Sequence, residues 1–306
     1  MAQFKRAKRN ISGVLLLDKP LGYSSNQALQ KVKWLFQAAK AGHTGTLDPL
    51  ATGLLPICLG EATKFAQYVT DADKTYLATI KLGSTTTTGD SEGATLTTAP
   101  VDVTPQQFEV ACQRFIGEIS QMPPMYSALK HQGKALYEYA REGVDIERQA
   151  RLISIRSIVV NDFAGDVATV TVICSKGTYI RTLAEDIGAN LGCGAHLVGL
   201  RRTETAGYQL QDAITLDALE EISAELRDER LLPVDSAIAS LPKILLKADA
   251  AYYIMQGQAI WMAGKIPDSE LRLYDEHDHF LGLGFLQDDG KIAPKRLIKN
   301  SPQVAD

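Results

Sequence analysis

The chain has 306 residues and a mass of 33.3 kDa, enough for two domains or for one large domain with an appendage. Apolar residues make up 45% of it and charged residues 22%, with 24 glycines and 12 prolines, which excludes disordered, collagen-like and coiled-coil proteins. The net charge of −4 is uneven, because the first hundred residues carry 11 Lys and Arg against 7 Asp and Glu, so the sequence is compatible with a polyanionic ligand.

No apolar run approaches the roughly 18 residues that a membrane-spanning helix needs, and the basic amino terminus leads only into the short stretch 14–17. We therefore expect a cytoplasmic protein that does not contact a membrane. The four cysteines are widely spaced and form no CxxC pair, which argues against a disulfide framework and against a zinc site. We expect them to be buried or inert thiols.

The first elements are predicted from apolar runs and turn residues. An apolar run over 11–17 has the length of a strand and ends at a proline-containing turn. A helix follows, capped by Ser24 or Ser25 and ending near Gln37, because apolar residues recur there at three- and four-residue spacing. Glycine, threonine and proline then punctuate residues 42–60, which predicts a structured loop around Asp48.

The middle of the chain alternates between strand and helix patterns. Residues 74–82 alternate as in a strand, with Tyr76 facing an interior or a cleft. A helix is expected over 105–117, followed by a polar, tyrosine-bearing segment over 122–151 that we interpret as an insertion or flap.

A strand over 167–174 leads directly into a helix over 180–192, a junction typical of ligand sites. Beyond it, the patterns predict a strand over 196–202, an acidic helix over 216–232, and a small β domain from about Leu245 whose short apolar segments lie at 260–262, 271–274 and 280–285.

Five polar or aromatic side chains stand out as candidates for chemistry. His43 and Asp48 share one glycine-rich loop, Arg181 lies at the strand-to-helix junction, and Tyr76 and Tyr179 could stack on a base. From the residues alone, each also has a structural explanation: a turn aspartate, a core histidine, a surface ion pair, or core tyrosines.

Six segments in chain order resemble the bacterial tRNA pseudouridine-55 synthases, the TruB family, over nearly the full length. They are GVLLLDKPLGYSSNQALQKVK from Gly13, GHTGTLDPLATGLLPICLGEATKF from Gly42, KTYLATIKLG from Lys74, YSALKHQGKALYEYAREG from Tyr126, CSKGTYIRTLAEDIG from Cys174 and HLVGLRRTETAG from His196. The second is similar to the family's catalytic motif and is highly specific. The loop TTTTGDSEG departs slightly, with Thr87 and Gly89 where relatives often carry an acidic and a small polar residue.

The resemblance implies an α+β fold with a mixed, mainly antiparallel sheet and flanking helices. It implies a catalytic domain over 1–245, with an RNA-binding thumb at about 123–151, and a small C-terminal β-barrel over 246–306 that resembles the PUA domain. The short apolar segments after Leu245 agree with that second domain.

The implied activity is the isomerisation of uridine-55 in the T loop of tRNA to pseudouridine, without metal or cofactor and after the base has been flipped out of its stack. By resemblance Asp48 is the nucleophile, Arg181 pairs with it and keeps its pKa low, and Tyr76 stacks on the base. Attack at C1′, attack at C6 and a glycal intermediate all remain open. No obligate protein partner is implied, and we expect a monomer.

The resemblance also implies substrate contacts. His43 would fill the gap left by the flipped base, Tyr179 and Leu200 would line the uridine pocket, and Lys19, Lys64 and Lys130 would approach the RNA. Two rival functions are retained: a non-catalytic chaperone for tRNA folding, and a guide-RNA-dependent pseudouridine synthase subunit.

Overall fold

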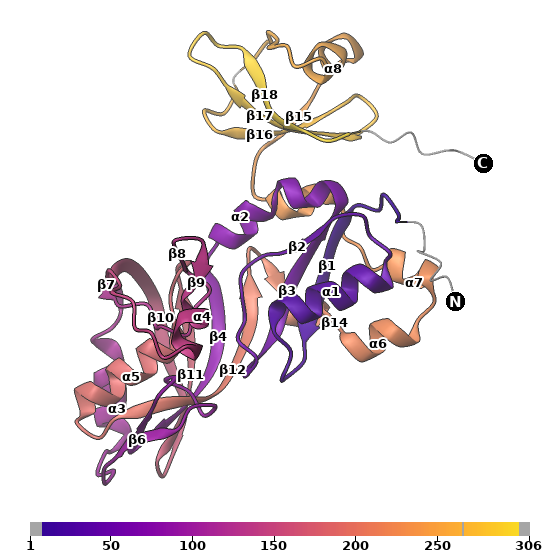
Figure 1. Cartoon of the computed structure of the whole chain (residues 1–306). Coiled ribbons are helices and arrows are strands. Elements are labelled where there is room, and N and C mark those ends of the chain that lie inside the picture. Colours follow the sequence, from indigo (N-terminus) through magenta and orange to yellow (C-terminus); the bar gives the residue numbers. More distant parts are fainter. Residues whose placement is uncertain (1–7, 265, 300–306) are drawn as a thin grey trace, which may run out of the picture.

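A computed structural model describes residues 8–264 and 266–299. Two sheets dominate it: a ten-stranded sheet in the body and a four-stranded sheet in a smaller domain reached through a linker (Figure 1). The predicted α+β class and the small C-terminal β domain are confirmed. Residues 1–7, 265 and 300–306, which the two predicted domain ranges include, lie outside the described residues.

The large sheet runs in the order β14-β1-β3-β12-β4-β11-β10-β7, with β2 paired to β3 and β13 paired to β12. Two of its pairs, β1 with β14 and β12 with β3, are parallel, and the others are antiparallel, so the sheet is mixed as predicted. The strands are β1 (Gly13–Lys19), β2 (Ala41–His43), β3 (Ala51–Leu59), β4 (Lys74–Leu82), β7 (Gly117–Gln121), β10 (Arg151–Ala164), β11 (Val167–Cys174), β12 (Ala195–Thr205), β13 (Tyr208–Gln209) and β14 (Ile214–Thr215).

Four helices bury their apolar stripes in one cluster with strands β1, β3, β4, β10, β11 and β12. They are α1 (Ser25–Leu35), α3 (Pro105–Gln113), α5 (Ile180–Leu191) and α6 (Leu216–Glu221). Tyr76 and Leu47 belong to this cluster, so the candidate residues lie beside the helix-bearing core. Helix α1 begins where predicted, since the Ser24 hydroxyl accepts the Gln27 N–H in a capping box.

The other side of β1 and β3 is buried as well, under η1 (Gly60–Lys64), α2 (Ala66–Asp71) and η3 (Val234–Ile238). Burial on both faces explains why β3 was wrongly predicted as part of a loop: its apolar run 54–59 shows no alternation. The predicted acidic helix over 216–232 is also wrong, because α6 ends at Glu221 and a second short helix, α7 (Ala224–Asp228), starts after the Ser223 cap.

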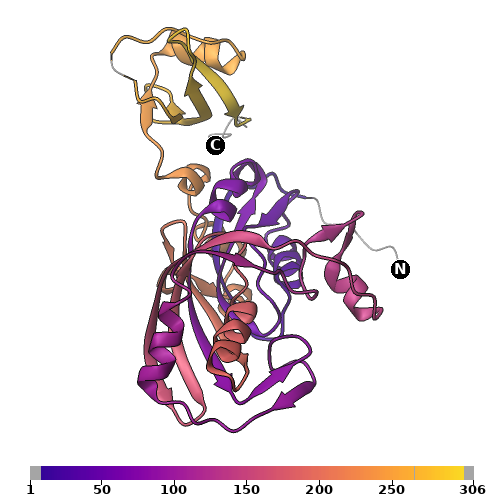
Figure 2. The same cartoon turned by 90° about the vertical axis from the view of Figure 1, so that its left-hand side faces the viewer.

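The segment between β7 and β10 projects from the body as a small hairpin and a helix (Figure 2). It contains β8 (Lys130–His131), β9 (Lys134–Ala135) and α4 (Leu136–Arg141) and corresponds to the predicted flap. A second hairpin of β5 (Ser84–Thr86) and β6 (Thr95–Thr98) encloses the threonine-rich loop, and η2 (Leu210–Asp212) follows β13.

The smaller domain consists of β15 (Lys243–Leu245), α8 (Ala248–Met255), β16 (Glu270–Tyr274), β17 (Phe280–Leu286) and β18 (Ile292–Leu297), with its own apolar cluster. Helix α8 was not predicted. The domain packs on the body through Phe65 and Phe280, whose ring centroids are 5.6 Å apart, and through Lys64 Nζ, which donates to the Leu297 carbonyl at 2.8 Å. Lys64 therefore connects the two domains, and its approach to the RNA stays a prediction.

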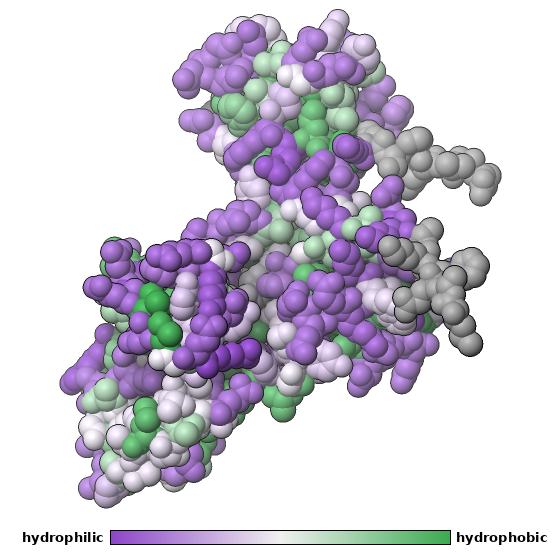
Figure 3. All heavy atoms as spheres, in the orientation of Figure 1, coloured by the Kyte–Doolittle hydropathy of each residue, from purple (hydrophilic) through white to green (hydrophobic). Residues whose placement is uncertain are grey.

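Hydrophilic residues cover most of the face drawn in Figure 3, on the body and on the small domain alike. Within the described part of the chain, no helix is long and apolar enough to cross a membrane, and no three His, Cys, Asp or Glu side chains gather as they would around a metal ion. All four cysteines are buried free thiols.

The parallel pair β3–β12 requires a glycine at one position. Gly53 has φ +99° and lies opposite Arg202, and a Cβ at Gly53 would lie 2.4 Å from the Arg202 carbonyl oxygen. The main chains therefore approach too closely there for any side chain.

We expect Gly53→Ala to lower the free energy of unfolding by about 2 kcal/mol more than Gly207→Ala, measured by chemical denaturation. Gly207 is the matched control, because it also has positive φ (+79°) but its Cβ would meet no atom within 4 Å. Equal losses in the two variants would show that the close approach of β3 and β12 is not a constraint.

Candidate active site

The loop between β2 and β3 holds Asp48 in place through helix α1. The Ser25 hydroxyl accepts the Leu47 N–H at 2.7 Å and donates to the Leu47 carbonyl at 3.0 Å, and the Ala51 N–H donates to the Asp48 carbonyl at 3.0 Å. The residue before Asp48 and the residue that starts β3 are therefore both fixed. Sequence analysis placed a cap at Ser24 or Ser25, and the structure gives these two serines separate roles.

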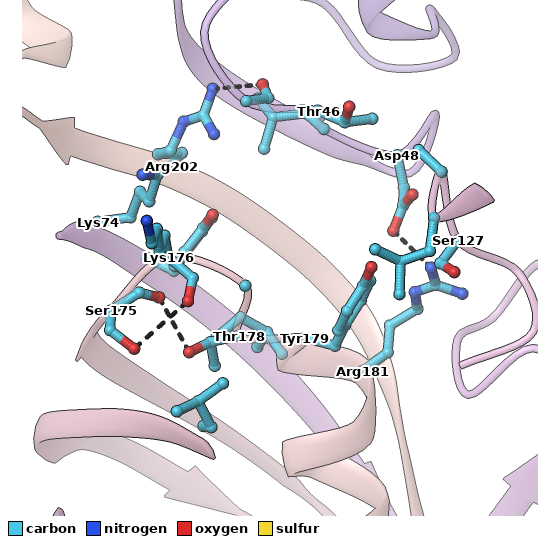
Figure 4. Close-up of a pocket in the computed structure, with 18 of the residues that line it drawn as sticks. Thr46, Asp48, Lys74, Ser127, Ser175, Lys176, Thr178, Tyr179, Arg181 and Arg202 are labelled. Carbon is cyan, nitrogen blue, oxygen red and sulfur yellow. Dashed lines mark hydrogen bonds and ion pairs between the residues drawn. The ribbon is translucent and has the colours of Figure 1, made fainter. Parts of the chain in front are cut away.

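Arg181, in the first turn of α5, forms an ion pair with Asp48, with Nη2 2.9 Å from Oδ2 (Figure 4). The same guanidinium donates from Nη1 to the Thr88 carbonyl at 2.9 Å and from Nη2 to the Tyr126 carbonyl at 2.6 Å. Only 5% of the Arg181 side chain is exposed. The structure thus brings together the predicted Asp48 and Arg181, and it shows that the threonine loop and the start of the thumb hold the arginine.

Asp90 is a further site residue that sequence analysis missed. Its carboxylate is buried, lies 3.7 Å from Arg181 Nε, and accepts hydrogen bonds from the Thr88 hydroxyl and from the Glu92 N–H. Arg181 therefore lies between two carboxylates. The available signal was an acidic pair, Asp90 and Glu92, in a loop otherwise made of threonine, glycine and serine, but the pairing of Asp90 with a residue 91 positions later has no local pattern.

Burial raises the pKa of Asp48, and the charge of Asp90 adds to the effect, while Arg181 and Lys19 act in the opposite direction. The expectation that Arg181 keeps this pKa low is therefore wrong, because removal of the carboxylate from water outweighs the ion pair. The 37% of the Asp48 side chain that stays exposed opens into a cavity rather than into bulk water. An anion held with less solvation than in water is a stronger nucleophile.

That cavity has a volume of about 520 Å³, in the range of sites that take small organic ligands. Asp48 and Arg181 share its wall with the predicted Tyr76, Tyr179 and Leu200. Five of the predicted site residues, drawn from β4, β12, α5 and two loops, therefore surround one space that fits a nucleotide base.

Tyr76 is 8% exposed, and burial raises the pKa of its phenol. A phenol with a raised pKa stays protonated at neutral pH, so it is a poor general base. The protonated Tyr76 side chain can instead stack on a ring and donate a hydrogen bond.

Tyr179 caps α5 and is held by Gln121, which is 2% exposed at the end of β7. The Tyr179 N–H donates to Gln121 Oε1 at 2.8 Å, and Gln121 Nε2 donates to the Tyr179 carbonyl at 3.1 Å. One side-chain amide thereby bonds to both the main-chain N–H and the main-chain carbonyl of Tyr179 at the cavity wall. Because the thumb starts at the next residue, Gln121 also connects the thumb to the cavity.

Three predicted substrate contacts lie outside this cavity. His43 lines a neighbouring cavity of about 740 Å³ that shares Asp48 and Arg181, and burial lowers its pKa, so the imidazole is neutral. Lys130 is exposed on β8, away from both cavities. Lys19 is completely buried, donates to the carbonyls of Pro20 and Tyr23, and acts on Asp48 through its charge, while its approach to the RNA stays a prediction.

We expect Gln121→Met to reduce the rate of any reaction at Asp48 by about tenfold under saturating substrate, because the Tyr179 N–H loses its partner and the Tyr179 carbonyl keeps only the Leu183 N–H. Single-turnover kinetics would measure this rate. Gln30→Met on the surface of α1 is the control. An unchanged rate in Gln121→Met would exclude the amide as a determinant of the site.

Comparisons with known proteins agree with this geometry. Residues 33–180 match the model of the TruB family pseudouridylate synthase N-terminal domain, residues 181–239 a tRNA pseudouridylate synthase B C-terminal domain, and residues 242–298 a Pseudouridine synthase II TruB C-terminal domain. The chain is 60% identical to the tRNA pseudouridine synthase B of Methylobacillus flagellatus, with 98% of this chain and 99% of the relative covered.

The tRNA pseudouridine synthase B of Pseudomonas aeruginosa is 51% identical, with 98% of this chain and 100% of the relative covered. Among solved structures, a Cbf5-Nop10-Gar1 complex contains a chain with a TM-score of 0.70 and 28% identity, covering 94% of this chain and 84% of that one.

Proposed function

Because the chain belongs to the TruB family of pseudouridylate synthases, we propose that it is an isomerase that converts uridine-55 in the T loop of tRNA to pseudouridine. The observation that carries this function is a carboxylate, Asp48, held by a buried arginine in the wall of a base-sized cavity that two tyrosines also line. The relatives named tRNA pseudouridine synthase B supply the substrate class.

In this mechanism the uridine leaves the RNA stack and enters the cavity, at a cost of a few kcal/mol of lost stacking. Tyr76 stacks on the base, while Tyr179 and Leu200 form the walls. His43, neutral and in the adjoining cavity, occupies the space left in the loop or contacts neighbouring bases. The exposed thumb carries Lys130 toward the RNA backbone.

Asp48 is the nucleophile of the proposed reaction. Arg181 fixes its rotamer through the 2.9 Å ion pair and is itself fixed by two carbonyls and Asp90, so the carboxylate is oriented before the substrate arrives. Arg181 favours the charged form of Asp48 that attacks, against the opposing effect of burial on its pKa. Arg181 orients the carboxylate in the same way whether Asp48 attacks C1′, attacks C6, or removes a proton from the sugar.

We further propose that residues 1–245 perform the chemistry and that residues 246–306 add contacts to the RNA, and that the enzyme works as a monomer in the cytoplasm. A guide-dependent role has one observation in its favour, the likeness to Cbf5 in a complex with Nop10 and Gar1, but identity there is 28% against 60% for the named tRNA enzyme. The chaperone role would not need Asp48.

We expect the purified chain, without metal, nucleotide or guide RNA, to convert one loop uridine of a T-arm hairpin, and Asp48→Asn to abolish conversion while hairpin binding is retained. The reason is that the amide keeps the shape of the side chain and loses its nucleophilicity. Pseudouridine is mapped by chemical labelling, and binding is measured by fluorescence anisotropy.

Asp102→Asn, an exposed aspartate before α3, is the matched control and should behave as wild type. Hairpin binding without conversion by the wild type would support the chaperone or guided role instead, and conversion by Asp48→Asn would exclude Asp48 as nucleophile.

A further inference from the structure

Two buried cations line the part of the cavity away from Asp48 and Arg181 (Figure 4). Arg202 on β12 is 1% exposed, and Lys74 at the start of β4 is 6% exposed. Neither stood out in the sequence, where Arg202 belongs to an arginine pair and Lys74 is the first residue of the alternating strand.

The strand register places both cations beside the tyrosine that stacks on the base. Arg202 lies directly opposite Tyr76 in the antiparallel pair of β12 and β4, and Lys74 precedes Tyr76 by two residues, so it projects from the same face of β4. A Cβ at Gly45 would lie 3.3 Å from Arg202 Nη1 and 3.9 Å from Lys74 Cε, which shows that the two side chains meet beneath the loop that carries Asp48.

The hydrogen-bond partners of both cations are backbone carbonyls. Arg202 donates from Nε to Leu54 at 2.7 Å and from Nη2 to Gly45 at 3.3 Å. Lys74 Nζ donates to Thr70 at 2.6 Å and to the carbonyls of Val69 and Ala72 near the end of α2.

No carboxylate oxygen within the described ranges 8–264 and 266–299 lies within 4.0 Å of a charged nitrogen of Lys74 or Arg202. The Cys174 thiol, opposite Lys74 in β11, is neutral because burial raises its pKa to about 11. Arg181 differs from both, since it has two carboxylates beside it.

A buried charge without a directly paired carboxylate costs free energy, and the cost is visible at Lys74, where burial and then the charge of Arg202 lower the pKa to about 8, against smaller opposing effects that include the charges of Asp71 and Asp73. Carbonyl dipoles reduce that cost without cancelling the charge. This wall of the cavity therefore has a positive potential in the absence of substrate, and an anion placed against it would be stabilised in a site of low dielectric.

The proposed reaction generates such an anion on the substrate, whichever route it takes. If Asp48 attacks C1′, the bond from its oxygen to C1′ forms while the C1′–N1 bond breaks, and the electron pair leaves on N1 of uracil. If the C2′ proton is removed instead, the same pair leaves on N1. If Asp48 adds to C6, the C5–C6 pair moves toward the C4 oxygen.

In the C1′ route the base then turns and C5 bonds to C1′, while the C1′–oxygen pair returns to Asp48. In the C2′ route the proton returns to C2′ as C5 bonds to C1′. In the C6 route the C1′–N1 bond of the adduct breaks, C5 bonds to C1′, and the bond from C6 to the Asp48 oxygen breaks with its electron pair returning to Asp48. In every route C5 finally loses a proton and N1 gains one, so no co-reactant is consumed. The uracil ring carries negative charge before the new bond forms in all three routes.

We propose that Arg202 and Lys74 stabilise the uracil anion while it is detached from, or rotating beside, the sugar. The inference rests on the proposed function and extends it by giving this wall of the cavity a role distinct from that of Asp48 and Arg181. The two cations act through their electrostatic field, which holds the uracil anion in the cavity. They form no bond with a reacting atom.

The test compares uridine with 5-fluorouridine at the target position of the T-arm hairpin. Fluorine at C5 withdraws electron density and makes uracil a more stable anion, so the steps up to formation of the C5–C1′ bond need less help from the protein. Because C5 then carries fluorine in place of a proton, this substrate cannot complete the final loss of a proton from C5, and only its disappearance is compared. The rate measured is the single-turnover disappearance of the unmodified nucleoside after complete digestion of the RNA, followed by mass spectrometry.

We expect Lys74→Met to slow the uridine reaction by about 100-fold and the 5-fluorouridine reaction by about tenfold or less, and Lys74→Arg to restore most of both rates. Lys74→Gln gives a second neutral variant if Lys74→Met fails to fold, and Arg202→Lys, which keeps the charge, should leave the ratio of the two substrates as in wild type. Thermal unfolding and hairpin affinity are measured for each variant.

Arg227→Met is the matched control, because Arg227 also holds two carbonyls, those of Leu219 and Glu220, but outside the site. It should leave the substrate ratio unchanged. Equal losses on uridine and 5-fluorouridine in the neutral Lys74 variants would overturn the inference and assign Lys74 a structural role. Inactivity of the wild type on uridine would contradict the proposed function itself.

Discussion

The ion pairs and hydrogen bonds of the buried Arg181 guanidinium organise the site. Its neighbours are the carboxylates of Asp48 and Asp90 and the carbonyls of Thr88 and Tyr126, which come from the glycine-rich loop, the threonine loop and the thumb. Because separating Arg181 from its two carboxylates would leave buried charges without their partners, at a cost of several kcal/mol, these segments have to meet at one point. The nucleophile is therefore placed by tertiary structure as a whole and not by its own loop alone.

The charged side chains on the two sides of the cavity have different partners. On one side Arg181 is shared by two carboxylates, and on the other side Arg202 and Lys74 donate to carbonyls and have no carboxylate within 4.0 Å among the described residues. The first arrangement orients an anion that belongs to the protein, and the second leaves positive potential for an anion that belongs to the substrate. Both arrangements depend on the central strands β4, β3 and β12, where the close contact at Gly53 sets the position of Arg202.

The spacing of apolar residues predicted the strands and helices that bury one face and leave the other more exposed. Strand β4 alternates and helix α5 carries a clear stripe, and both were predicted within two residues of their observed ends. Strand β3 was missed because both of its faces are buried, which removes the alternation. The family motifs gave Asp48, Tyr76 and Arg181 as candidates, but Asp90 and Gln121 act through contacts 91 and 58 residues away in the chain, and no periodicity reports such pairs. The raised pKa of Asp48 likewise depends on burial, which the motif does not show.

The central claim is that a fork-shaped cation holds Asp48 for attack, and Arg181→Lys tests it most directly. A lysine keeps the charge but cannot reach both carbonyls and both carboxylates at once. Measured as single-turnover pseudouridine formation at saturating T-arm hairpin, the variant should lose about 100-fold or more in rate while its hairpin affinity stays near that of wild type. A variant as fast as wild type would show that charge alone is sufficient and that the observed geometry around Arg181 does not position the nucleophile.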